Sequence, residues 1–184
     1  MRTARILRVF TLAAAPLAGL SGCAGHSVRP PRLVPLPGAS YSLQGEAASI
    51  RTATLRLTIA PLDDAARRAY IRERTPAGSD EFGPGADGKT RYFTFELVLE
   101  NLGEKDPISF QPQGVILAQE GGDRVSPLDF PQAYRLLAGR DNVDPRLLED
   151  LSKYMFDVGV TLSPGERIDR LLIYPAQKVR AKKL

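Results

Sequence analysis

The sequence predicts a mainly β fold, an antiparallel β-sandwich with two or three short helices, and three observations favour it. Apolar and polar residues alternate with a period of two in several short segments, as in strands that bury one face. Glycine and proline, 16 and 15 of the 184 residues, are concentrated in the turns between these segments. The helical segments do not alternate with the strands as parallel βαβ units require, so we expect antiparallel pairing.

The first 22 residues are predicted to be a signal peptide. Arg2, Arg5 and Arg8 precede an uncharged stretch, residues 9–20. As a helix this stretch would be about 18 Å long. Because the hydrocarbon core of a bilayer is roughly 30 Å thick, a permanent transmembrane helix is disfavoured.

The only cysteine of the chain, Cys23, follows Leu20, Ser21 and Gly22. This run resembles the lipobox of bacterial lipoproteins, in which signal peptidase II cuts before a lipidated cysteine. The resemblance implies that Cys23 carries a diacylglycerol and usually a third acyl chain such as palmitate, which together anchor a protein stably. It also implies that Ala24, in place of aspartate, favours the outer membrane. The alternative is an ordinary secretory signal that leaves a free thiol.

After cleavage, subtracting the three signal arginines from the net charge of +4 leaves +1. Residues 23–40 contain four prolines without apolar periodicity, which predicts a flexible tether behind the lipidated N-terminus. Residues 41–176 are predicted to form one domain, and residues 177–184 a basic tail. The interpretations left open for this tail are contact with acidic head groups and a solvated terminus.

The first predicted strand covers residues 52–59, where Leu55, Leu57 and Ile59 share one face, and Pro61 is expected to end it. A helix should follow, with Asp63 as its N-cap. The predicted helix has acidic Asp64 in its first turn and basic residues towards its end. Its expected apolar stripe consists of Leu62, Ala65, Ala66, Ala69 and Tyr70. Residues 75–89 are rich in glycine and predict a mobile surface loop.

The second half of the domain is predicted to hold six strands and two helices. The strands are expected over residues 92–100, 107–111, 115–119, 124–126, 156–162 and 167–174. One helix should begin with a capping box at Asp129 and Gln132 and end at Gly139. The other should begin at Asp144 and Pro145. Residues 163–166 suit a type II turn.

Two longer segments carry a resemblance of fold. They are FTFELVLENLGEKDPISFQPQGVILAQEGGDRVSPLD (residues 93–129) and LSPGERIDRLLIYP (residues 162–175). Both are similar to paired strands of immunoglobulin-like domains in bacterial envelope lipoproteins, over roughly residues 50–175. The resemblance implies an immunoglobulin-like sandwich but no particular function. Without tryptophan or a disulfide, the antibody-type core is excluded.

The sequence predicts no catalytic residue, metal ligand or cofactor. The only histidine, His26, lies in the tether, so the domain lacks a Ser-His-Asp set and a cysteine–histidine zinc site. Asp63 and Asp64 are better explained by helix capping than by carboxylate chemistry. A calcium site remains an alternative for Asp141, Asn142 and Asp144, although the spacing matches no EF-hand loop. A glycosidase-like carboxylate pair also stays open.

We expect a non-catalytic outer-membrane lipoprotein that faces the periplasm and acts by protein–protein contact, with an unidentified envelope partner and no nucleic acid. Tyr92 and Val98 would join a binding patch unless helices cover their face of the sheet.

Two alternatives remain. DFPQAYRLLAG, DPRLLEDL and LSPGE are loosely similar to the outer-membrane lipoprotein of the type VI secretion system. A small periplasmic enzyme or ligand-binding protein would instead use a pocket under the loop of residues 75–89.

Overall fold

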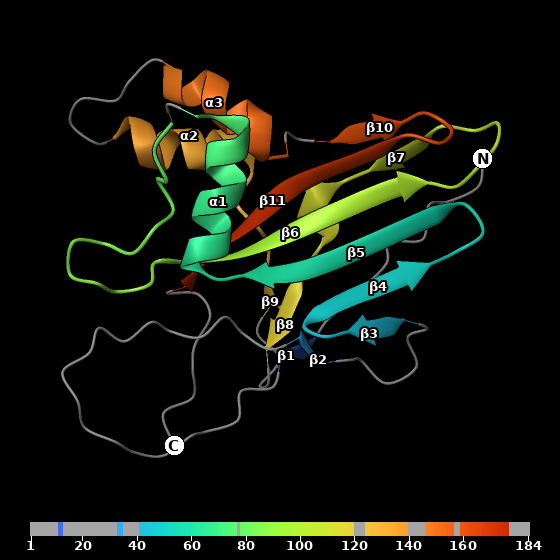
Figure 1. The fold of residues 1–184 in the computed structure, drawn as a ribbon, viewed down its shortest axis with the longest axis horizontal. Coiled ribbons are helices and arrows are strands. Elements are labelled where there is room, and N and C mark those ends of the chain that lie inside the picture. Colours follow the sequence, from blue (N-terminus) through green and yellow to red (C-terminus); the bar gives the residue numbers. More distant parts are fainter. Residues whose placement is uncertain are drawn as a thin grey trace.

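The structure, a computed structural model, describes residues 11–12, 33–34, 41–76, 78–119, 124–139, 146–156 and 159–176. Its largest element is a five-stranded antiparallel sheet (Figure 1). In spatial order the strands are β11 (Arg167–Pro175), β6 (Tyr92–Asn101), β5 (Leu55–Leu62), β4 (Ala47–Arg51) and β3 (Ser42–Gln44). The predicted mainly β class is confirmed.

The remaining described strands are short. β10 (Val160–Leu162) pairs antiparallel with β7 (Ile108–Phe110). β8 (Leu117–Gln119) pairs antiparallel with β9 (Arg124–Val125) and parallel with β1 (Thr11–Leu12), and β1 also pairs with β2 (Leu33–Val34). The 3₁₀ helix η1 (Pro112–Gly114) lies between β7 and β8 in the chain.

One hydrophobic core lies between one face of the five-stranded sheet and the segments that contain the short strands. The sheet contributes alternate apolar residues of β5, β6 and β11, as their period of two dictates. The opposite side contributes Val115, Leu117, Val125, Phe156 and Leu162. The Tyr174 hydroxyl donates a hydrogen bond to the Val115 carbonyl at 2.8 Å, which ties β11 to the opposite layer.

Helices α1 (Asp64–Arg74), α2 (Phe130–Ala138) and α3 (Arg146–Tyr154) lie against the other face at one end of the sheet (Figure 1). They enclose a second core with the sheet residues Leu62, Tyr92, Leu171 and Ile173. Tyr92 is therefore covered by the helical layer, as one of the two interpretations predicted. Val98 lies beyond this core and is half-buried.

The predicted N-caps Asp63 and Asp129 are confirmed, and the cap predicted at Asp144 and Pro145 lies outside the described residues. Asp63 Oδ1 accepts a hydrogen bond from the Ala66 amide at 2.8 Å, and Asp129 and Gln132 form the full capping box. The predicted apolar stripe of α1 is confirmed at Leu62 and Tyr70 and wrong at its three alanines. Ala65, Ala66 and Ala69 are exposed, whereas Arg67, Tyr70 and Ile71 are buried. Charged Arg67 occupies a core-facing position because the carboxylates of Asp64 and Asp80 compensate its charge, as described below.

The first strand differs from its prediction at both ends. Residues 52–54 form a turn in which Thr52 Oγ1 accepts the Leu55 amide at 2.9 Å. Pro61 lies inside β5 and does not end it. The pairing of β5 with β4 stops at Ile59, so Pro61 pairs only with β6, where a proline is tolerated. The hairpin of β3 and β4 was not predicted, and it turns through Gly45 at φ +63°.

Asn101 fixes the turn at the end of β6. Its Nδ2 donates to the carbonyls of Asp106 and Leu162, each at 3.0 Å, and its Oδ1 accepts the Gly103 amide at 2.8 Å. The predicted turn over residues 163–166 is also present, with Gly165 at φ +73°.

Candidate functional site

Polar side chains gather where α1 meets the loop that follows it and strands β6 and β11. Two clusters are distinct. The buried cluster consists of Asp64, Arg67 and Asp80. The half-exposed cluster consists of Tyr70, Arg74, Glu96 and Asp169. Because residues 67, 70 and 74 are three or four apart, one helix face presents residues to both clusters.

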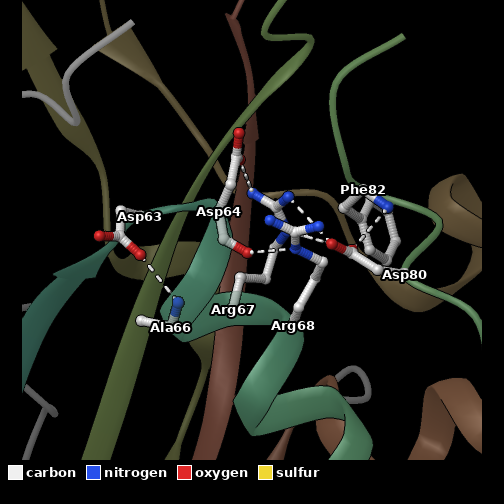
Figure 2. Close-up of polar contacts among 7 residues, drawn as sticks. All are labelled: Asp63, Asp64, Ala66, Arg67, Arg68, Asp80 and Phe82. Atoms are coloured by element: carbon white, nitrogen blue, oxygen red, sulfur yellow. Dashed lines mark hydrogen bonds and ion pairs between the residues drawn. The ribbon is translucent and has the colours of Figure 1, made fainter. Parts of the chain in front are cut away.

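In the buried cluster, Arg67 is held by two carboxylates and its side chain is only 2% exposed (Figure 2). Its Nε donates to both oxygens of Asp80 at 3.1 and 3.0 Å, and Nη2 donates to Asp80 Oδ2 at 2.9 Å. Nη1 lies 2.7 Å from Asp64 Oδ1. Burial alone would lower the pKa of Arg67, but Asp80 and Asp64 outweigh it and raise the pKa. Arg67 therefore stays charged in the interior.

This ion pair holds the loop against the helix. The Phe82 amide donates to Asp80 Oδ1 at 3.2 Å, which orients Phe82 inwards (Figure 2). Phe82 is 1% exposed and meets Tyr92 edge-to-face with ring centroids 5.4 Å apart. Arg67 and Phe82 thus fill space beneath the loop that the ligand-binding alternative assigned to a pocket.

The half-exposed cluster centres on Asp169 of β11. Its Oδ2 accepts the Tyr70 hydroxyl at 2.8 Å and also pairs with Arg74. The Arg74 guanidinium lies 3.5 Å from the centre of the Tyr70 ring, a cation–π contact. Burial alone would raise the pKa of Asp169, but the Tyr70 hydrogen bond and Arg74 outweigh it and lower the pKa. Asp169 is thus an ionised acceptor that fastens α1 to the sheet.

Glu96 lies beside this network and takes no part in its hydrogen bonds. It is half-buried on β6, opposite Leu171 of β11 and Ala60 of β5. Burial, followed by the charge of Asp169, raises the pKa of Glu96, while Arg74 and Arg167 oppose the shift. Within the described residues, Glu96 has no hydrogen bond or ion pair.

These environments determine what each group can do. The guanidinium of Arg67 faces two carboxylates inside the protein. Burial, followed by the hydrogen bond and charge of Asp169, raises the pKa of Tyr70, so its phenol stays protonated. Asp169 and Glu96 are neighbouring carboxylates whose pKa values are pushed in opposite directions. Of the carboxylates in the two clusters, Glu96 is the one with no hydrogen bond or ion pair within the described residues.

The residues predicted to carry the lipid anchor, Leu20, Ser21, Gly22 and Cys23, lie outside the described residues. The same holds for His26 and for the calcium alternative at Asp141, Asn142 and Asp144. Asp63 caps α1 and Asp64 pairs with Arg67, which confirms the structural interpretation of that acidic pair.

The sequence did not single out Tyr70, Arg74, Glu96 or Asp169 as a group. One signal could have indicated part of it. Tyr70 and Ile71 are the two largest apolar residues of α1, and they place residues 67 and 74 on the same face, towards the sheet. Nothing local to Asp169 or Glu96 indicated which residue of the helix each would meet.

Comparisons with protein-family models, with curated proteins and with solved structures found no match to this chain. Among the described helices, none is long and apolar enough to cross a bilayer. In the same part of the chain, no three histidine, cysteine or carboxylate side chains are arranged to hold a metal ion.

Proposed function

We propose that this chain is a lipid-anchored envelope protein without catalytic activity, whose domain works by contact with another envelope protein. Signal peptidase II removes residues 1–22, Cys23 carries the acyl chains, and residues 24–40 tether the domain to the outer membrane on its periplasmic side. The observation that carries the proposal is the sole cysteine of the chain placed directly after Leu20, Ser21 and Gly22. An anchor of two or three acyl chains is stable, because each buried methylene contributes about 0.8 kcal/mol.

The domain itself is proposed to be an immunoglobulin-like sandwich with an added helical layer. Support comes from the core between the five-stranded sheet and the short strands, and from the hydrogen bond of Tyr174 across it. The helices add the second core on the opposite face of the sheet.

Contact with a protein is supported by the surface of the sheet. The helices cover only one end of it, and the opposite ends of β4, β5 and β6 stand clear of the helical layer (Figure 1). Most charged groups of the candidate site neutralise one another, as Arg67 does with Asp80 and Arg74 with Asp169. Such internal pairing suits a rigid binding scaffold better than it suits proton transfer.

The anchor is tested in the native host by labelling with a clickable palmitate analogue, followed by mass spectrometry of the N-terminal peptide. The wild-type protein should begin at acylated Cys23, and a signal peptidase II inhibitor should leave the signal peptide attached. Cys23→Ala should abolish labelling, whereas Ser21→Ala, which keeps a small residue, should preserve it. An unacylated Cys23, or cleavage elsewhere, would overturn the proposal.

A further inference from the structure

The part of the five-stranded sheet that the helices leave uncovered contains a continuous patch of short side chains around Glu96. We call it the outer sheet patch and define it as Ser49, Thr58, Ala60, Glu96 and Val98. These residues alternate with core residues along β4, β5 and β6, so they face away from the first core. Their registers place them side by side: Ser49 opposite Thr58, Thr58 opposite Val98, and Ala60 opposite Glu96.

Glu96 is the one charged residue of this patch, and in the part of the chain that the structure describes it has no hydrogen bond or ion pair. Arg74, the arginine of the adjacent helix end whose charge acts on Glu96, is committed to Asp169 and to the Tyr70 ring. Arg167 of β11 is exposed and acts on Glu96 only through its charge, without an ion pair. By contrast, Glu100 on the same face of β6 pairs with Arg56 at 2.5 Å.

A half-buried carboxylate without a hydrogen-bond donor works against folding, because it gives up hydration and the charges of Arg74 and Arg167 only partly offset that loss. Residues that lower the stability of a fold are expected at the sites where the protein performs its function. The short side chains of Thr58, Ala60 and Val98 leave the Glu96 carboxylate within reach of a group that approaches the sheet from outside. The nearby charge of Asp169 makes a cation the complementary group.

We propose that Glu96 accepts a lysine or arginine side chain of an envelope protein that docks on the outer sheet patch. This inference rests on the proposed function and deepens it, because it names the surface and the chemistry of the partner. A cation seated there would complete the interaction that the fold leaves open and would exclude water from the patch.

The test places a photo-crosslinking amino acid at Val98 in the full-length lipoprotein, expressed in its native host. A second set of cells carries it at Tyr134, which is 40% exposed and belongs to α2, outside the outer sheet patch. The adduct is digested, and mass spectrometry identifies the partner residue. We expect an adduct at Val98 whose partner peptide contains lysine or arginine.

Charge variants then decide the role of Glu96. In the protein that carries the crosslinking amino acid at position 98, Glu96→Gln should reduce the adduct yield about tenfold. A hydrogen bond to a charged group contributes roughly a tenfold factor or more to affinity. Glu100→Gln is the matched control, with the same chemical change on the same strand and face, and should leave the yield unchanged. Exchanging the charges, with Glu96→Lys here and glutamate for the basic residue of the partner, should restore the adduct. Loss through unfolding is separable, because Glu96→Gln is expected to raise stability.

Several outcomes would overturn the inference. They are an undiminished adduct in Glu96→Gln, an adduct with a second copy of this chain or with lipid, and no adduct at Val98. An adduct at Tyr134 alone would refute this docking site and leave protein contact as the function. The absence of an adduct at both positions would count against the proposed function as well.

Discussion

Replacing Asp80 by asparagine should destabilise the protein by about 2–4 kcal/mol, and the structure explains why. The carboxylate accepts three hydrogen bonds from Arg67, whose side chain is 2% exposed. Removing one partner of a buried ion pair costs about 3–5 kcal/mol, because the other charge stays buried without compensation. Here Asp64 still contacts Arg67 at 2.7 Å, but its side chain is 33% exposed and screened by water. We therefore expect a loss below the upper end of that range.

The assay is urea unfolding of the purified protein at neutral pH, monitored by circular dichroism. Asp80→Asn should lower the midpoint and leave the denaturant slope unchanged. The matched control is Asp87→Asn in the same loop, where the carboxylate is exposed and pairs loosely with Lys89 and Arg91 at 3.6 and 3.9 Å. This control should unfold at the wild-type midpoint.

A double variant tests the physical reason. Arg67→Met combined with Asp80→Ala removes both charges, so it should lose less stability than Asp80→Asn alone. Two results would show that burial of the Arg67 charge is not what makes the pair important. One is an equal urea midpoint for Asp80→Asn and Asp87→Asn. The other is a lower midpoint for the double variant than for Asp80→Asn.

Three further predictions concern other polar groups. Tyr174→Phe should cost about 1–2 kcal/mol in the same assay, because it removes a buried hydrogen bond to Val115. Tyr154→Phe should cost nothing, because no described group bonds the buried Tyr154 hydroxyl; equal losses in the two variants would contradict this. Asn101→Ala should cost about 2–3 kcal/mol, since it leaves two carbonyls and one amide without their partner, and a wild-type urea midpoint would refute that role. Glu96→Gln should raise the thermal midpoint at neutral pH. The folded protein holds the Glu96 proton more tightly than the unfolded chain, so the wild type gains relative stability as pH falls through the raised pKa and the difference should shrink there. A constant difference across pH would contradict this assignment.

Much of the fold could be predicted because it depends on neighbours in sequence. The alternation in β6 and β11 placed both strands within one residue of their observed ends. Asp63 and Asp129 cap their helices through contacts three residues away. Pro61 was interpreted wrongly for the opposite reason. Whether a proline ends a strand depends on which strand lies alongside it, and that is decided by pairing distant in sequence.

The candidate site could not be predicted because its chemistry depends on long-range contacts. Arg67 and Arg74 are two arginines on the same face of α1, and local sequence rules do not indicate which of them is buried. The fold distinguishes them, since one meets Asp80 in the interior and the other meets Asp169, 95 residues away in the chain. The same logic sets Glu96 apart from Glu100: two glutamates on one face of one strand, of which only Glu100 has an arginine opposite it. What makes Glu96 a functional candidate is therefore a contact that no other described residue provides, and local sequence patterns do not indicate which contacts a fold leaves out.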